Sequence, residues 1–403
     1  MRSARRRSPR DAERPSFRLL QHRDELDELI AVLQDEPQYA LDTEFHRERT
    51  YYPHLALLQV AWAGGIALID PLVVEVAPFA EVLSGDGVAV LHAADQDLEV
   101  LERACGLVPK RLFDTQLVAG FDGLSSPSLS TLIERLLGLR LEKGDQLTDW
   151  TRRPLSEAQL SYAASDVAYL LEVKALLEEH LDTSGRLAWA EEECAALIAR
   201  ARPAVVPEES WWRLKHARQL RGRERQIAQA VAAWRERRAQ RLDVPTRFVL
   251  SDLALVSIAH RPPDSRAGLE AVRGLEARSL GGGVAEELLA AIRAGITMAP
   301  GELRLPPGPP ADAVARPAAA LGAAWVAGRA RELRIDTTLL ATRADLAAFF
   351  RETPEGRLTT SWRNELVGEP LRQLAGGELA LAVGPDGGLV LEERSFRPVS
   401  AEE

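Results

Sequence analysis

The sequence predicts an α/β domain with a mixed sheet, followed by all-helical domains. Three observations lead to this fold class. Residues 17–93 alternate short apolar runs with turn signals, and the pattern becomes helical after His92. A proline-rich stretch at residues 301–320 interrupts the helical part. Strands followed by helices are typical of a sheet with helices packed on it, and 403 residues allow two to three domains at roughly 150 residues each.

The first domain is expected at residues 17–207, after a basic and disordered arm of residues 1–16. Its elements are expected in the order strand 17–20, helix 24–34, strands 39–45, 55–62, 66–71 and 88–92, and helices 96–105, 129–137 and 156–180. Gly64-Gly65 is a hairpin signal between two strands. Ser156 with Gln159 three residues later matches a capping box, which sets the start of the last helix.

A second helical domain is expected at residues 208–296, with the loop Arg261-Pro262-Pro263 inside it. Residues 297–322 are expected to form a Pro/Ala-rich linker, because prolines block regular structure. Helical patterning returns in the C-terminal region, residues 323–403, and ends in a short strand pair around Pro385–Gly388.

The net charge of −10 hides an uneven distribution. Residues 1–16 carry +4, residues 17–207 carry −16, residues 208–296 carry +5 and residues 297–403 carry −3. Between Arg213 and Arg247 stand 11 basic and 3 acidic residues, and the arginines are expected to form an exposed face. A solvated face is the usual explanation of mixed charges, but a run of one sign favours binding to nucleic-acid phosphates. The candidate nucleic-acid-binding residues are Arg213, Lys215, Arg218, Arg221 and Arg223.

Composition excludes several other classes of protein. Two cysteines, Cys105 and Cys194, cannot make a disulfide framework, so a reduced cytoplasmic compartment is expected. Seven histidines show no spacing typical of zinc sites. The basic N-terminus lacks the apolar core of a secretory signal. The uncharged residues 50–69 contain Pro53 and two glycines, so we interpret them as two strands and a turn and expect no membrane span.

Three clusters of polar residues are candidates for chemistry. Asp42 and Glu44 are two apart on a predicted strand and therefore share a face. Asp97 lies in the first turn of a helix that follows a strand, where ligands collect in α/β sheets. Tyr162 and Asp166 are four apart on a helix and share a face. Each cluster alone also has a simpler explanation. The pair Asp42 and Glu44 can occur by chance, an acid in the first turn of a helix can cap it, and Tyr162 can be half-buried beside a solvated Asp166.

Taken together, these residues resemble the DEDD 3′→5′ exonucleases of the tyrosine subclass. The segments that resemble ribonuclease D, over residues 17–180, are LDTEFHRERTYYPHLALLQV, ALIDPL, VLHAADQDLEVL, LFDTQLVAGF and GDQLTDWTRRPLSEAQLSYAASDVAYLL. Residues 208–296 resemble an HRDC domain, and residues 323–380 resemble a second HRDC-like region more loosely. The resemblance implies a ribonuclease H-like mixed sheet followed by HRDC-type helical domains.

The resemblance also implies an activity and roles for the candidate catalytic residues. It implies a cytoplasmic 3′→5′ exoribonuclease that uses two Mg²⁺ ions, with Mn²⁺ as a substitute, and releases nucleoside 5′-monophosphates from the 3′ ends of transfer RNA precursors and other structured RNAs. Asp42, Glu44 and Asp166 would hold the metal that activates water, and Asp42 would also reach the second metal. Asp97 would support the second metal directly or through water, and Tyr162 would position or deprotonate the attacking water.

Two alternatives remain at this stage. A 3′→5′ DNA exonuclease would share the same acids, and no residue identifies a contact to a 2′-hydroxyl. A non-catalytic nucleic-acid-binding module is disfavoured, because all four acids and Tyr162 are present. Around the site, Arg47 and Arg49 are expected either to contact phosphates or to be solvated loop charges. His92 is expected in the core or behind the site, and Asp114 is expected to start a helix.

Overall fold

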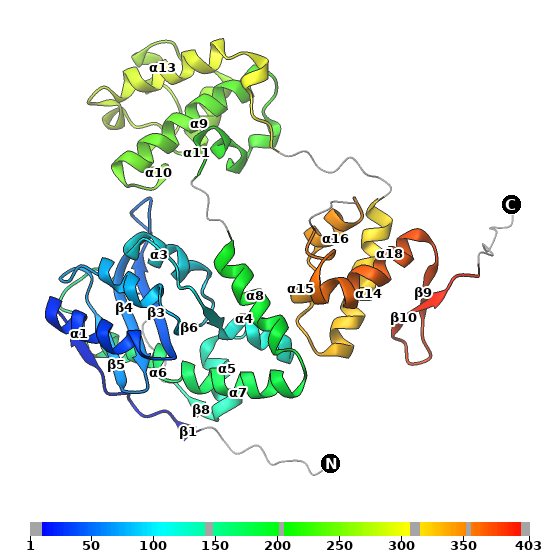
Figure 1. Ribbon diagram of the computed structural model, residues 1–403. Coiled ribbons are helices and arrows are strands. Elements are labelled where there is room, and N and C mark those ends of the chain that lie inside the picture. The colour runs from blue at the N-terminus through cyan, green and yellow to red at the C-terminus, as the bar shows by residue number, and fades with distance from the viewer. Residues whose placement is uncertain (1–9, 142–147, 201–204, 307–314, 352–355, 396–403) are drawn as a thin grey trace.

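The computed structural model describes residues 10–141, 148–200, 205–306, 315–351 and 356–395 (Figure 1). It comprises an α/β domain, a helical middle domain and a mainly helical C-terminal domain, so the expected fold class is confirmed. In the part of the chain that is described, no helix combines the length and apolarity needed to cross a bilayer.

The α/β domain is built on a six-stranded mixed sheet in the order β2-β5-β4-β3-β6-β7. The strands are β2 (Arg18–Leu20), β3 (Gln38–His46), β4 (His54–Trp62), β5 (Gly65–Ile69), β6 (Val88–Leu91) and β7 (Leu112–Asp114). β4 is antiparallel to both β3 and β5, and the remaining pairs are parallel. The sequence did not predict β7, because three residues are too few to show a period of two.

The helices of this domain pack against the sheet or against one another. They are α1 (Arg23–Gln34), α2 (Ala80–Leu83), α3 (Asp95–Cys105), α4 (Thr115–Ala119), α5 (Leu129–Leu137), α6 (Glu157–Ala168), α7 (Leu170–Thr183) and α8 (Leu187–Ala199), with short 3-10 turns at η1 (Ala77–Phe79) and η2 (Gly120–Asp122). The prediction of one helix from Ser156 to His180 was wrong, because Tyr169 (φ −112°, ψ 0°) ends α6 before α7 begins.

The N-terminal arm is ordered closer to the terminus than expected. β1 (Arg10–Asp11) pairs in parallel with β8 (Leu139–Arg140). The hydroxyl of Tyr169 donates to the carbonyl oxygen of Glu13 over 3.4 Å. The disordered arm was expected at residues 1–16. Residues 1–9 lie outside the described part of the chain, and residues 10–13 contact the α/β domain.

The middle domain has a hydrophobic core of its own. Its elements are η3 (Pro207–Arg213), η4 (Ala217–Gln219), α9 (Arg223–Leu242), α10 (Thr246–Val249), α11 (Asp252–His260), α12 (Arg266–Glu270), η5 (Ala277–Leu280), α13 (Val284–Thr297) and η6 (Pro300–Glu302). The long helices α9 and α13 approach each other at Gly295, where an added Cβ would lie 2.6 Å from Cα of Ile227. Only glycine allows this close packing.

The C-terminal domain begins with α14 (Ala315–Leu333), which starts inside the segment expected to be a linker. It continues through α15 (Thr337–Leu340), α16 (Arg343–Phe349), α17 (Ser361–Arg363), the π-helical turn η7 (Asn364–Gly368), α18 (Glu369–Gly376), β9 (Leu379–Val383) and β10 (Leu389–Glu393). The last two strands pair antiparallel, as expected for the turn at Pro385–Gly388.

The C-terminal domain shares its core with the α/β domain. Trp362 stacks on Trp189 of α8 with ring centroids 5.0 Å apart, and its edge meets Phe121 at 5.4 Å. The buried carboxylate of Glu193, also on α8, pairs with Arg357 and Arg363. The C-terminal domain is therefore a structural extension of the α/β domain.

Candidate active site

The two acids of the first cluster project from the middle of the sheet. Asp42 and Glu44 lie on β3, which is hydrogen-bonded to β4 on one side and β6 on the other. Their cross-strand partners on β4 are Gln59 and Leu57, and a bulge follows Glu44. Because directly opposed residues of an antiparallel pair share a face, all four side chains lie on one face of the sheet.

Helix α6 brings the third carboxylate over this face. The capping box at Ser156 and Gln159 is present, as expected, and starts the helix. Tyr162 and Asp166 follow on one side of it, and α6 crosses β3, β4 and β5. Carboxylate oxygens of Asp42, Glu44 and Asp166 all lie within 4.8 Å of one another. Residues far apart in the sequence therefore meet in a single cluster.

Asp97 is buried beside this cluster and does not belong to the group of three within the described residues. The hydroxyl of Thr43 donates to its Oδ1 over 2.5 Å. Since Thr43 stands between Asp42 and Glu44, its side chain lies on the opposite face of β3. The structure thus leaves Asp97 at the side of the cluster.

The start of α3, which carries Asp97, depends on Asp114 at the end of β7. The buried Asp114 carboxylate accepts from the backbone N–H groups of Ala93 and Ala94, over 3.0 and 2.9 Å. It also caps α4 by accepting from Gln116 and Leu117. Asp114 therefore starts a helix, as expected, and in addition fixes the turn that leads into α3.

His92, at the end of β6, lies behind the site as expected. Its ring nitrogens contact Thr115 Oγ1 at 2.9 Å and the Pro127 carbonyl oxygen at 3.1 Å, so both are occupied. Burial lowers the pKa of the imidazole. These contacts indicate a structural residue.

The clustered acids repel one another. Burial, followed by the charges of Asp97, Asp166 and Glu44, raises the pKa of Asp42 well above its usual range. Burial and the charges of Asp166 and Asp97 raise the pKa of Glu44 to about 8. Burial raises the pKa of Asp166 to about 7 against a hydrogen bond from Tyr162, and that of Asp97 to about 6.

A cation would relieve this repulsion. None of the cluster's three acids is paired with Lys, Arg or His in the described ranges. Several converging carboxylate oxygens are hard ligands, which suit a divalent cation such as Mg²⁺ or Mn²⁺. The residues that are present therefore fit a divalent metal, with Asp42, Glu44 and Asp166 as ligands.

One supporting ion pair was missed at the level of the sequence. The guanidinium of Arg153 donates to both carboxylate oxygens of the buried Asp70, over 2.6 and 2.7 Å, and to the carbonyl oxygens of Ala56 and Trp150, each over 2.7 Å. The Trp150 ring lies 6.2 Å from that of Tyr162. The segment WTRRPL carries Arg153, but its partner Asp70 is 83 residues away and no local pattern joins the two.

The loop after β3 is attached to the middle domain. Asp243, at the end of α9, accepts from the backbone N–H groups of Tyr51 and Tyr52, each over 3.1 Å. It also contacts Nε2 of His54 at 2.5 Å. The loop at residues 47–53 continues the strand that carries Asp42 and Glu44, so the middle domain contacts the segment that directly follows this strand.

The two loop arginines differ in their partners. Arg47 forms a two-bond ion pair with Glu99 of α3, over 2.9 and 3.1 Å. Arg49 is exposed, and its side chain makes no ion pair in the described residues. Arg247 of α10 donates to the carbonyl oxygen of Glu48 over 2.8 Å. Arg49 is thus the loop arginine that is free to contact a phosphate.

All five candidate nucleic-acid-binding residues are exposed. Within the described residues, Arg213, Lys215 and Arg218 form no ion pair. The side chain of Arg221 donates to the carbonyl oxygen of Arg218. The side chain of Arg223 donates to the carbonyl oxygen of Ile296, near the end of α13. The first three remain available for phosphates, whereas the last two also have structural contacts.

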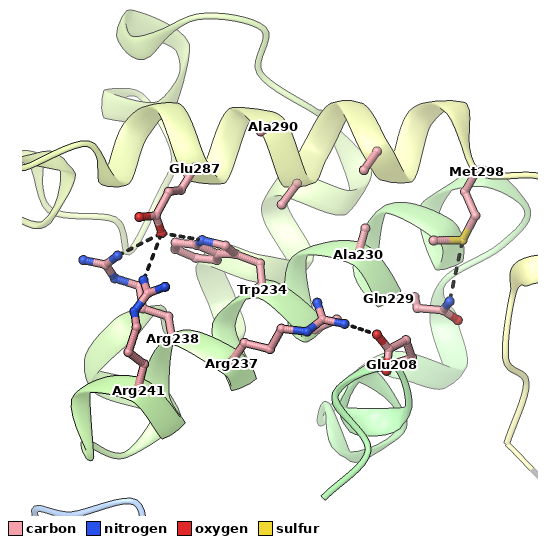
Figure 2. A pocket seen from close by; sticks show the side chains of 13 residues that line it. Glu208, Gln229, Ala230, Trp234, Arg237, Arg238, Arg241, Glu287, Ala290 and Met298 are labelled. Atoms are coloured by element: carbon pink, nitrogen blue, oxygen red, sulfur yellow. Dashed lines mark hydrogen bonds and ion pairs between the residues drawn. The ribbon is translucent and has the colours of Figure 1, made fainter.

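The later arginines of α9 do not form one exposed face, contrary to expectation. Arg235 is buried and paired with Asp252 at 2.7 Å. A hollow of about 480 Å³ lies between α9 and α13. Figure 2 shows that Arg238, Arg241 and the indole N–H of Trp234 converge there on the carboxylate of Glu287. Much of the positive charge of α9 is therefore neutralised within the domain.

Comparisons with known proteins agree with this arrangement. Residues 17–182 match the family model of a 3′-5′ exonuclease, and residues 224–292 match that of the HRDC domain. The chain is 37% identical over 373 residues to ribonuclease D of Acidiphilium cryptum, covering 89% of this chain and 94% of that one. It is 38% identical over 368 residues to ribonuclease D of Jannaschia sp., covering 89% and 95%.

A solved structure is similar as well. The crystal structure of Escherichia coli RNase D, an exoribonuclease involved in structured RNA processing, superposes with a TM-score of 0.79 and 33% identity. The similarity covers 90% of this chain and 99% of that one. It therefore includes the α/β domain and most of the helical domains.

Proposed function

The chain belongs to the ribonuclease D family and is a 3′→5′ exoribonuclease, and we propose that its hydrolysis takes place at Asp42, Glu44 and Asp166. The mutual approach of their carboxylate oxygens to within 4.8 Å supports this most directly. The family and the acidic cluster imply a divalent metal. We propose two Mg²⁺ ions, for which Mn²⁺ substitutes.

The bound metal would lower the pKa of the attacking water and stabilise the leaving 3′ oxygen. The residues of the chain prepare the site for this. Asp42 and Glu44 are held by the central strand, and Asp166 by the capped helix α6. Asp97, whose Oδ1 accepts from Thr43, is proposed to support the second metal directly or through water.

Tyr162 is proposed to orient the attacking water. It lies one helical turn before Asp166 and donates a hydrogen bond to it. A phenol hydroxyl both donates and accepts hydrogen bonds, so positioning of the water requires no proton loss from Tyr162. Arg153 supports this arrangement by holding the segment that carries Trp150.

The proposed substrates are the 3′ ends of transfer RNA precursors and other structured RNAs, and the proposed products are nucleoside 5′-monophosphates. The E. coli relative, which processes structured RNA, supports this substrate class. We propose that the HRDC domain contacts the RNA backbone through Arg213, Lys215 and Arg218, with Arg221 and Arg223 contributing charge. Two free, buried cysteines agree with a proposed cytoplasmic location.

The test uses 5′-labelled single-stranded RNA and DNA of the same sequence, with Mg²⁺ and with EDTA. The intact chain should give a descending ladder on RNA and release nucleoside 5′-monophosphates, identified by mass spectrometry. Asp166→Asn should lower the rate at least a hundredfold, about 3 kcal/mol of transition-state stabilisation. Glu157→Gln, an exposed acid at the start of the same helix, is the matched control and should leave the rate unchanged.

Other outcomes would revise the proposal. Faster digestion of DNA than of RNA would overturn the proposed substrate class. Binding of RNA without digestion of either nucleic acid would favour a binding module. Full activity in EDTA would exclude the metal.

A further inference from the structure

One fully buried polar side chain lies beside the acidic cluster without a partner. Gln59 is 0% exposed, and neither its Nε2 nor its Oε1 has a hydrogen-bond partner among the described residues. A buried amide without partners costs free energy in a folded protein. An apolar residue of the same size would avoid that cost, so a role in the site would explain why glutamine stands there.

The position of Gln59 is set by the strand register. It lies directly opposite Asp42 on β4, and its partner on the other side, on β5, is Leu68. Opposed residues of antiparallel strands have Cβ atoms about 5 Å apart and point to the same face. The Gln59 side chain therefore lies between the sheet and α6, next to Asp42 and beneath the helix that carries Asp166.

Asp42 differs from Asp97 and Asp166 in its hydrogen-bond partners. Asp97 is held by the hydroxyl of Thr43, and Asp166 accepts from Tyr162. For Asp42, the described residues provide only a backbone hydrogen bond from Thr43. The central acid of the cluster thus lacks a side-chain donor, while an amide with an unused donor lies across the strand pair.

We propose that Gln59 is a positioning residue for Asp42: once the metal is bound, its amide N–H, which has no partner among the described residues, donates to one oxygen of the Asp42 carboxylate and leaves the other oxygen turned toward the metal. The inference rests on the proposed metal site. This hydrogen bond would stabilise the metal-bound orientation of the carboxylate, so Gln59 acts on metal affinity and on the rate at saturating RNA. It contacts neither RNA nor the attacking water.

The test compares Gln59→Met with Leu68→Met. Methionine has nearly the shape of glutamine without its hydrogen bonds, and Leu68→Met places the same side chain one strand further from Asp42. In Gln59→Met, the dissociation constant for Mg²⁺, measured by calorimetry on the metal-free chain, should rise about tenfold. The kcat should fall about tenfold with an unchanged KM for RNA. Both values should stay within twofold of wild type in Leu68→Met.

Thermal unfolding in EDTA separates this role from a purely structural one. Gln59→Met should unfold at the wild-type temperature or above, because it removes a buried amide without partners. Wild-type Mg²⁺ affinity and kcat in Gln59→Met would overturn the inference, as would an equal loss in Leu68→Met. If Gln59→Met does not fold, Gln59→Leu gives the same comparison. Absence of Mg²⁺ binding by the wild-type chain would instead refute the proposed metal site.

Discussion

Replacing Asp114 with alanine should destabilise the α/β domain and displace an acid of the site. The carboxylate accepts four backbone N–H groups, two before α3 and two at the start of α4, over 2.9 to 3.2 Å. It is 3% exposed, so water cannot easily replace it. Helix capping by such a side chain contributes about 1 kcal/mol.

The two N–H groups of Ala93 and Ala94 add to this loss. Ala93 has a positive φ of 61°, a conformation that the surrounding contacts must hold. Each buried hydrogen bond to a charged group contributes about 1.5–3 kcal/mol. Those two hydrogen bonds and the lost cap together contribute about 4–7 kcal/mol, and the net loss is smaller because the alanine variant avoids the cost of burying a carboxylate. We expect a total of about 3–5 kcal/mol.

Urea unfolding of the metal-free chain measures this loss, with Ser128→Ala as the control. Ser128 also caps a helix of the same domain, α5, but holds only that helix, so its loss should cost about 1 kcal/mol. Activity measured where Asp114→Ala is still folded should fall at least tenfold, because Ala93 and Ala94 lead into the helix that carries Asp97. A cost equal to that of Ser128→Ala, or full activity, would refute the reasoning.

Three further predictions concern pH, the buried ion pair and the domain interface. In the metal-free chain, Glu44 and Asp166 have pKa values raised to about 8 and 7, so the folded state binds more protons than the unfolded state, and stability should fall as pH rises from about 5 to 8. Melting temperatures measured in EDTA at several pH values test this loss of stability, and Glu44→Gln should make the loss smaller. A melting temperature of the wild type that does not change with pH would contradict the prediction. Mg²⁺ affinity should rise over the same pH range. Arg153→Met should cost about 3–5 kcal/mol in urea unfolding, because it leaves the carboxylate of Asp70 buried and unpaired. The double variant with Asp70→Leu should recover part of that loss, and no recovery would show that the ion pair is not the cause. Trp362→Ala should cost about 3–5 kcal/mol and lower the temperature at which exonuclease activity is lost, since its ring packs on Trp189 and Phe121 of the α/β domain. Equal inactivation temperatures of this variant and the wild type would show that packing of the C-terminal domain does not stabilise the α/β domain.

Local sequence patterns are sufficient to predict which strand and which helix carry the residues of the site. A period of two puts Asp42 and Glu44 on one face, and a separation of four puts Tyr162 and Asp166 on one side of a helix. Ser156 and Gln159 fix where that helix begins. These relations depend only on the geometry of a single strand or helix, so they can be derived without knowing what packs against it.

Other features of the chain could not be predicted in this way. The strand β7 is too short for a periodic signal, and the split of the long helix at Tyr169 depends on the dihedral angles of one residue. The burial of Arg235 among exposed arginines follows from its partner Asp252 on another helix. A hydrophobic pattern shows which face is buried, but not which charged residue finds a partner there.

The sequence by itself determined the acids, their order and the family they resemble, because each motif lies within one element. Only the tertiary structure decided that Gln59 lies opposite Asp42, that Asp114 connects β7 to the start of α3, and that the C-terminal domain packs on the α/β domain. The physical reason is that strand register and helix packing are fixed by cooperative burial of surfaces from distant segments. Contacts between residues 17 to 241 positions apart therefore produce no signal in any local sequence pattern.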